Sequence, residues 1–190
     1  MAASKSQVRI IAGRWRGSKL PVVDAAGLRP TPDRIRETLF NWLAPDCRGA
    51  RVLDCCAGSG VLGLEAVSRG ATSLVAIEQN AAAARALETT VERLGGDSVQ
   101  VIRGDAAAVI EQLEGPFDIV FIDPPYARPE LRQQLFQQLQ AQQLLAEGAC
   151  IHFEWPDTET FELPSAALEL RRQKSAGQVN YAVAEWRRSG

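Results

Sequence analysis

The stretch Asp123-Pro124-Pro125-Tyr126 combines residue types that can handle an amine. It follows the apolar run 117–122, which is typical of a buried strand, and the two prolines force the chain out of that strand in a rigid extended turn. A carboxylate and proline carbonyls accept the hydrogens of an exocyclic NH2 group, and a tyrosine ring stacks on a flat nitrogenous base. The stretch predicts amine alkylation at the carboxyl edge of a sheet, where ligands bind in α/β folds; an ordinary strand-ending turn is the alternative.

A glycine-rich turn, Gly58-Ser59-Gly60, lies between a predicted strand and a predicted helix, and Gly63 completes the pattern G-x-G-x-x-G. Taken literally, this pattern predicts a dinucleotide site and a dehydrogenase. Asp54 at the mouth of the turn would repel a pyrophosphate but would hold an ammonium group. S-adenosylmethionine fits better, because it has no phosphate, carries a positive sulfonium, and ends in a carboxylate that suits the N–H groups of a helix N-terminus.

Acidic residues lie at or just after the carboxyl ends of four predicted strands: Asp54, Glu78, Asp105 and Asp123. We expect Glu78 to accept ribose hydroxyls, and Asp105 to accept from the adenine amine, to cap the following helix, or to do both. Four acids along one sheet edge favour a shared ligand over four unrelated surface acids. The expected cofactor-binding residues are Asp54, Gly58, Ser59, Gly60, Glu78, Gln79, Asp105, Ala106 and Asp123.

The composition is that of a globular protein with one domain. The chain has 190 residues, of which 46% are hydrophobic and 23% charged, and no apolar run approaches a membrane span. The first residues lack the apolar core of a signal peptide, so we expect a cytoplasmic protein. Four cysteines without a C-x-x-C pair make a metal site or a disulfide framework improbable.

Positive charge gathers at the N-terminal end of the chain. Residues 1–50 hold nine Lys/Arg against four Asp/Glu, whereas residues 51–190 hold twelve against nineteen. This asymmetry favours a local patch for a polyanion over a uniformly basic surface, although a solvated charged face explains the counts equally well.

The segments 8–12 and 19–23 predict two short strands of a hairpin with a basic, aromatic tip. Arg14, Arg16 and Lys19 are expected to contact nucleic-acid phosphates. Two interpretations of Trp15 remain open, because the ring either stacks on an unpaired base or packs under the hairpin.

A helix is predicted after the hairpin, with Thr31 as its cap and Pro32 at its first position. Arg29, Arg34 and Arg36 cluster at its start. We expect these arginines to face nucleic acid, with an ordinary solvated surface as the alternative.

From residue 51 onward, strands and helices alternate, which predicts a mostly parallel sheet with helices on both faces. A basic hairpin extension at 1–27 and a catalytic core at 28–190 are the expected parts of the single domain. The predicted strands are 52–56, 74–78, 99–102, 117–122 and 149–154, with a closing hairpin of 167–174 and 178–186; the predicted helices are 61–69, one capped by Asn80 and ended by Gly95, 106–113 and 129–143.

Taken together, these motifs resemble the class I S-adenosylmethionine-dependent methyltransferases, and more closely the RsmD family of bacterial 16S ribosomal RNA guanine-N2 methyltransferases. The closer resemblance rests on the segment 9–17, on the segment 29–40, and on the LD..AGSG.LGLEA..RGA run that begins at Leu53. It implies a Rossmann-like sheet of seven strands with the last one antiparallel. It also implies action on ribosomal RNA within the small subunit or an assembly intermediate. Nothing in the sequence requires more than a monomer.

The same resemblance implies roles for the residues of the Asp-Pro-Pro-Tyr turn. Asp123 and the Pro124 carbonyl would accept hydrogen bonds from the amine of a flipped-out guanine, Pro125 would complete the rigid turn, and Tyr126 would stack on the base. Methyl transfer would be a direct in-line displacement, helped mainly by positioning and electrostatic stabilisation.

Four other functions remain as alternatives. A DNA adenine or a protein glutamine methyltransferase would use the same turn, and a non-catalytic ribosome-assembly protein that binds RNA would retain the cofactor pocket. A dehydrogenase is the least favoured, because the turn has no role in hydride transfer.

Overall fold

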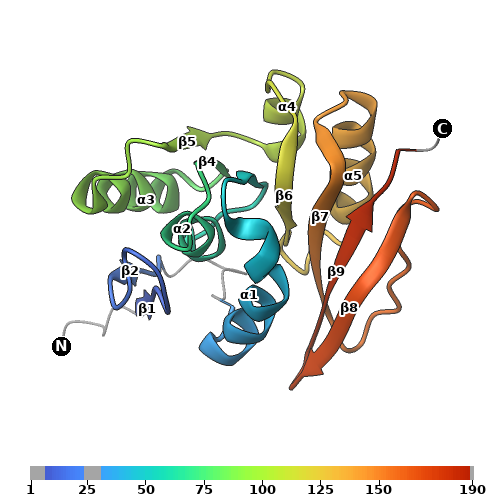
Figure 1. Ribbon diagram of the computed structural model, residues 1–190, viewed down its shortest axis with the longest axis horizontal. Coiled ribbons are helices and arrows are strands. Elements are labelled where there is room, and N and C mark those ends of the chain that lie inside the picture. Colours follow the sequence, from blue (N-terminus) through green and yellow to red (C-terminus); the bar gives the residue numbers. More distant parts are fainter. Residues whose placement is uncertain (1–6, 24–30, 189–190) are drawn as a thin grey trace.

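The computed structural model describes residues 7–23 and 31–188. Nine strands and five helices follow one another in the order shown in Figure 1. They are β1 (Gln7–Arg9), β2 (Lys19–Pro21), α1 (Asp33–Cys47), β3 (Arg51–Asp54), α2 (Val61–Ser68), β4 (Ser73–Glu78), α3 (Ala81–Leu94), β5 (Val99–Arg103), α4 (Ala106–Ile110), β6 (Phe117–Ile122), α5 (Glu130–Ala141), β7 (Leu145–Pro156), β8 (Leu168–Ala176) and β9 (Val179–Trp186).

The main sheet has seven strands in the order β5-β4-β3-β6-β7-β9-β8. The first five in this order pair in parallel, and β9 pairs antiparallel with both β7 and β8. This confirms the mostly parallel sheet with an antiparallel last strand. The closing hairpin of β8 and β9 was expected to form an antiparallel edge of the sheet. Only β8 lies at the edge, because β9 is inserted between β7 and β8.

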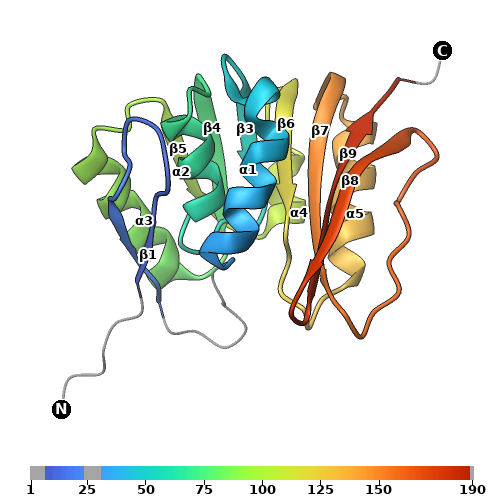
Figure 2. The ribbon, with the colours of Figure 1, turned by 60° about the horizontal axis from the view of Figure 1, so that its bottom comes forward.

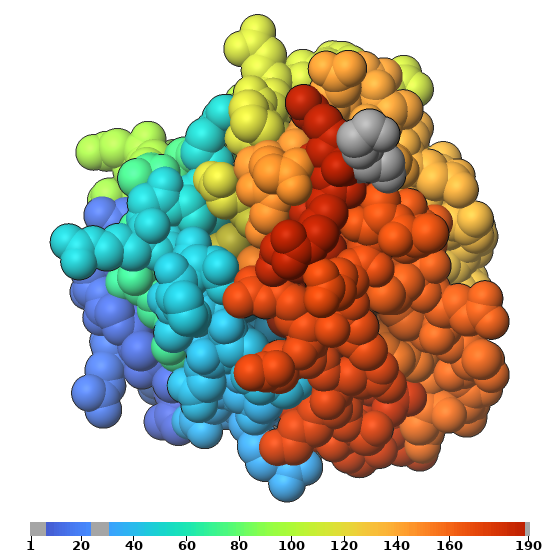
Figure 3. Space-filling view, turned by 45° about the vertical axis from the view of Figure 1, so that its right-hand side comes forward, coloured from blue at the N-terminus to red at the C-terminus, as the bar shows by residue number. Residues whose placement is uncertain are grey.

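Helices cover both faces of the sheet, as predicted. Figures 1 and 2 show α1, α2 and α3 on one face, with the hairpin of β1 and β2 against them, and α4 and α5 on the other. Each face has its own apolar cluster of buried side chains. Figure 3 shows the side of the molecule where β8 and β9 form the surface between α1 and α5. Every described helix is too short or too polar to cross a lipid bilayer.

Two predicted helix ends are set by local chemistry, and one is not. The Asn80 side chain accepts from the N–H groups of Ala82 and Ala83, and Gly95 ends α3 in the left-handed region at φ 63°, which confirms both predictions. The predicted Thr31 cap is wrong, because α1 begins after Pro32 with no side-chain cap. Thr31 is buried instead, and its carbonyl accepts from a guanidinium of the helix.

The largest differences in element length follow from tertiary pairing. β7 starts at Leu145 and ends at Pro156, longer than the predicted 149–154, because its ends pair with Phe117 of β6 and Val179 of β9. The α4 helix stops at Ile110, three residues before the predicted end. The partners of β7 are distant in sequence, and local residue preferences do not reveal them.

Candidate active site

The four acids expected at one sheet edge lie at that edge. β4, β3 and β6 are adjacent parallel strands, so Glu78 at the end of β4, Asp54 at the end of β3 and Asp123 after β6 emerge side by side. Asp105 follows β5, the next strand outward. The charges of Asp123 and Glu78 both contribute to raising the pKa of Asp54, in accord with this proximity.

The glycine turn is held by the Glu78 carboxylate. One oxygen accepts from the N–H of Gly58 at 2.7 Å, and the other accepts from the N–H of Asn80 at 2.6 Å. Gly60 lies in the left-handed region at φ 75° and precedes the first residue of α2. A single acid therefore ties the turn after β3 to the start of α3.

Asp54 anchors the other side of the turn. Its carboxylate accepts from the N–H of Gly63 at 3.2 Å, and a Cβ atom on Gly63 would lie 2.7 Å from the Leu74 side chain. The third glycine of the pattern therefore permits close packing of α2 on the sheet. Burial raises the pKa of Asp54 to about 7. A buried carboxyl of this kind is stabilised as an anion by a cationic ligand.

Asp105 has the capping role that the sequence predicted. Its side chain accepts from the N–H of Ala107 at 3.0 Å and so caps α4. The same carboxylate lies 3.6 Å from the Arg128 guanidinium, in the segment after the Asp-Pro-Pro-Tyr turn. Of the other expected cofactor residues, Ser59 is half-buried, Gln79 is exposed and Ala106 is buried.

The Asp-Pro-Pro-Tyr turn leaves β6 beside β7. Burial raises the pKa of Asp123 to about 7, and the nearby Arg132 guanidinium opposes this shift. Tyr126 is 43% exposed, and its hydroxyl donates to Glu154 at 3.1 Å. Pro124 is buried, which keeps the turn rigid. The turn thus presents a carboxylate and an exposed aromatic face at one position.

Glu154 was missed as a site residue, because it was assigned only to a strand. It lies near the end of β7, is 6% exposed, and faces the Asp-Pro-Pro-Tyr turn through Tyr126. An acid among the apolar residues of a buried strand was the available signal.

The hairpin of β1 and β2 is fixed to the helices behind it. Both Glu65 oxygens accept from hairpin N–H groups, of Ile11 at 2.7 Å and of Ala12 at 3.0 Å. Ser68 donates to the Ala12 carbonyl and accepts from the N–H of Trp15. The hairpin is therefore docked on α2, the helix that begins at the glycine turn.

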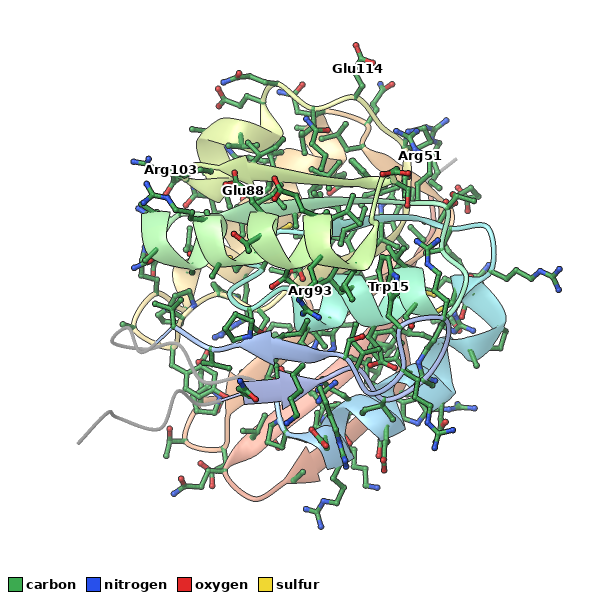
Figure 4. The ribbon with its side chains drawn as sticks, turned by 90° about the vertical axis from the view of Figure 1, so that its left-hand side faces the viewer. Trp15, Arg51, Glu88, Arg93, Arg103 and Glu114 are labelled. Carbon is green, nitrogen blue, oxygen red and sulfur yellow. The ribbon has the colours of Figure 1, made fainter. Side chains whose placement is uncertain are left out.

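Of the two interpretations of Trp15, packing under the hairpin is confirmed, and stacking on an RNA base is excluded by the burial of the residue. Its ring is 8% exposed, and its Nε1 donates to the Leu94 carbonyl at 3.0 Å. Figure 4 shows the ring between the hairpin and the helices, with Arg93 of α3 nearby. Arg93 donates to the Lys19 carbonyl at 2.7 Å, which ties the second strand to α3.

Arg36 was expected to contact RNA, and its position rules this out. The side chain has no exposed surface and lies 2.6 Å from Asp33 and 3.5 Å from Glu65. It also donates to the carbonyls of Thr31 and Arg9. The buried guanidinium thus joins α1, α2 and the hairpin in one polar cluster.

The other expected RNA-binding residues are four exposed side chains and one residue outside the described part of the chain. The side chains of Arg14, Arg16, Lys19 and Arg34 are exposed. Arg14 lies over the Trp15 ring, with its guanidinium carbon 4.2 Å from the ring centre. Arg29 lies outside the described residues.

Comparison with known proteins gives consistent matches along nearly the whole chain. Residues 8–185 match the family model described as "Conserved hypothetical protein 95". The "Ribosomal RNA small subunit methyltransferase D" of Escherichia coli strain K12 is 43% identical over 181 residues, covering 95% of this chain and 91% of that protein.

Solved structures are also similar. The "putative methyltransferase yhhF" from Escherichia coli superposes with a TM-score of 0.88 at 40% identity, covering 97% of this chain and all of the other. An O-methyltransferase from Bacillus cereus in complex with SAH has a TM-score of 0.67 at 17% identity, covering 86% and 84% of the two chains, and shows the shared fold.

Proposed function

Since this chain belongs to the family described as conserved hypothetical protein 95, with the ribosomal RNA small subunit methyltransferases D among its relatives, we propose that it methylates the exocyclic N2 amine of a guanine in small-subunit ribosomal RNA. The chain is an S-adenosylmethionine-dependent ribosomal RNA methyltransferase. The guanine, its N2 atom and the small-subunit context are the proposed part. One observation carries the proposal. The Asp-Pro-Pro-Tyr turn follows β6, the glycine turn follows β3, and these adjacent parallel strands end at the same sheet edge.

The residues at this edge fit S-adenosylmethionine. Its sulfonium supplies the methyl group to be transferred. The N-terminus of α2 would hold its carboxylate, Asp54 would hold the ammonium, and Glu78 and Asp105 would accept from the ribose and the adenine amine. Burial of Asp54 and Asp123 raises the pKa of both carboxyls to about 7, which favours a ligand that brings positive charge.

The roles of the turn residues follow from their chemistry. Asp123 accepts a hydrogen of the guanine amine and directs the nitrogen lone pair towards the methyl group, with the Pro124 carbonyl as a second acceptor. The carboxylate also stabilises the positive charge that develops on that nitrogen. Tyr126 offers its exposed ring as a stacking surface for the flipped-out base. Holding both reactants in line is worth roughly 7–11 kcal/mol of the barrier.

We propose a division of labour along the chain. Residues 28–190 form the catalytic core, and residues 1–27 form an extension that grips RNA as part of the small subunit or an assembly intermediate. The exposed Arg14, Arg16 and Lys19 support this for the hairpin, and Arg34 extends the basic surface onto α1. One copy of the chain carries every residue of the proposed site.

Replacing Arg16 and Lys19 together by alanine should weaken RNA binding without changing cofactor affinity. In a plot of log K for RNA binding against log salt concentration, each lost phosphate contact reduces the magnitude of the slope by roughly 1. RNA affinity measured between low and moderate salt checks this, with cofactor affinity as a second readout. Arg48→Ala, an exposed arginine before β3 at the opposite sheet edge, is the control and should leave the slope unchanged. Equal slopes for the unaltered protein, the double variant and the Arg48 variant would contradict RNA contact by the hairpin.

Replacing Gly60 by alanine should weaken cofactor binding by about tenfold, the effect of roughly 1.4 kcal/mol. The residue has φ 75°, and an added Cβ would lie 2.3 Å from a Leu87 methyl group, so the turn must shift. Calorimetric titration with S-adenosylmethionine measures the effect. Gly148→Ala is a matched control, since it has φ 77° and open space around its Cβ position. A similar affinity in both variants would contradict the role of the turn.

Radiolabelled methyl transfer tests the proposed function directly. The acceptors are small ribosomal subunits from cells that lack this gene, naked small-subunit RNA, duplex DNA and total protein, with nucleoside analysis of the product. Label in RNA as N2-methylguanine is the expected result. Label only in DNA or protein would agree with the catalytic role of the turn but would contradict RNA as the substrate. Cofactor binding without transfer to any acceptor would favour an RNA-binding assembly protein.

A further inference from the structure

Glu154 lies next to Asp123 at the carboxyl edge of the sheet. β6 and β7 are parallel neighbours in which Ile122 is opposite Phe153, so Asp123 and Glu154 are the next residues on the two chains. The charge of Asp123 contributes to raising the pKa of Glu154. Two carboxyl groups thus stand side by side where the proposed function places the base.

The two oxygens of Glu154 differ in their contacts. Oε1 accepts from the Tyr126 hydroxyl at 3.1 Å. Oε2 is buried and has no hydrogen-bond partner among the described residues. The nearby Arg132 donates to the Glu154 main-chain carbonyl and pairs with Glu159, so these bonds leave Oε2 unpaired.

An unpaired buried oxygen is unusual in a folded protein, since most buried polar atoms have a partner. Leaving one unpaired is costly, and a ligand that donates to it would remove this cost. The partner expected here is a donor that lies beside the amine bound to Asp123, because the two acids are neighbours.

Guanine has such a pair of donors on its Watson–Crick edge. Its ring N1–H is adjacent to its exocyclic N2 amine, so two neighbouring acceptors match it. In adenine and cytosine, the ring nitrogen next to the amine is an acceptor and would face a carboxyl oxygen without a hydrogen between them. A site built around a substrate N–H rejects analogues that lack it by large factors.

We propose that Glu154 is a specificity-determining residue, whose Oε2 accepts the N1–H of guanine while Asp123 accepts from the N2 amine. This rests on the proposed function and explains why guanine is selected. The bond from Tyr126 to Oε1 joins the stacking ring to the group that reads the base.

Hydrogen bonding to Glu154 favours its charged form. In the free protein, burial and the charge of Asp123 raise the pKa of Glu154 to about 9, and the hydrogen bond from the Tyr126 hydroxyl opposes this shift. A guanine N1–H at Oε2 would oppose it further. The ionised carboxylate accepts at both oxygens and has no hydrogen to offer the acceptor nitrogen of adenine or cytosine.

The test compares two acceptor bases in otherwise identical RNA. The guanine that receives the label is located first, and the same RNA is then made with 2,6-diaminopurine at that position. This analogue keeps the 2-amino group, but its N1 is an acceptor. For the unaltered protein, we expect kcat/KM to be about 10- to 100-fold lower with the analogue.

Glu154→Ala and Glu154→Gln should both bring the ratio of the two kcat/KM values close to 1. Alanine removes the acceptor, and the glutamine amide turns either its oxygen to N1–H or its NH2 group to a ring acceptor. Glutamine is nearly isosteric, so it keeps the test valid where alanine disturbs folding. Glu147→Ala, an exposed acid nearer the start of β7, is the control and should keep the unaltered ratio.

A purely structural role of Glu154 would lower both rates together and leave the ratio unchanged, and that result would overturn the inference. A wild-type product other than N2-methylguanine would instead overturn the proposed function. The two failures are therefore distinguishable in one set of reactions.

Discussion

Replacing Asp123 by alanine is expected to lower the rate of methyl transfer by about 10³-fold, the loss seen when one preorganised group that stabilises transition-state charge is removed. Cofactor affinity should change by less than tenfold, because Asp54, Glu78 and Asp105 remain. Single-turnover transfer at saturating cofactor measures the chemical step, and calorimetry measures binding. Asp118→Ala is the control, since Asp118 lies on the same strand and accepts from the Arg51 N–H near the start of β3. Normal turnover in the Asp123 variant would reject the catalytic assignment.

The same carboxylate predicts a pH dependence. Burial raises the pKa of Asp123 to about 7 and the ionised form is the acceptor, so the transfer rate should rise with pH up to about 7 and then level off. Asp123→Asn keeps an acceptor oxygen but cannot titrate. At saturating cofactor, whose ammonium holds Asp54 ionised, the slower rate of this variant should be flat over this range. A wild-type profile as flat as that of the variant would exclude titration of Asp123.

Stability depends on pH in the opposite direction. The pKa of Asp123 is higher in the folded than in the unfolded protein, so its contribution to stability is complete below the usual carboxyl range and is lost as pH rises through about 7. Because a cationic ligand favours the ionised form, S-adenosylmethionine should raise Tm more at pH 8 than at pH 6. Thermal scans with and without the cofactor at both pH values measure this difference.

Replacing Arg36 by alanine should have the largest effect on stability. The guanidinium is fully buried between Asp33 and Glu65 and donates to two carbonyls. Removing one partner of a buried ion pair costs about 3–5 kcal/mol. For a domain of this size, about 2–4 °C is lost per kcal/mol, which corresponds to a Tm decrease of roughly 6–20 °C.

Arg34→Ala provides the comparison, because Arg34 lies two residues earlier on the same helix and is exposed. Its free energy of unfolding should change by no more than about 0.5 kcal/mol. Denaturant titration of both variants measures the difference. Equal stability of the two would show that the cluster around Arg36 does not hold the hairpin to the core.

The sequence predicts the parts of this fold that depend on local chemistry. The Asn80 cap and the Gly95 end of α3 are set by neighbouring backbone groups. The parallel core follows from the alternation of strands and helices. The length of β7 depends on distant partners. The Thr31 cap was wrong, because α1 begins after Pro32 and Thr31 is buried before it.

The candidate site was predicted to a similar extent. Residue type and position placed the four acids at one edge, since the carboxyl ends of parallel strands meet there. Residue type alone could not tell which side of an element Trp15 and Arg36 face, and both proved to be buried. Glu154 was missed because its neighbour Asp123 is 31 residues away in the chain and close only across the sheet.

The position of β9 has a consequence for biosynthesis. β7 pairs with β9 on the side away from β6, and β8 pairs only with β9 among the described strands. On the ribosome, β7 therefore has an open edge, and β8 has no partner, until Val179–Trp186 has left the exit tunnel. An open edge of this kind invites pairing with other chains. The nascent protein is most exposed to aggregation in that interval, and the edge that carries Glu154 is completed last.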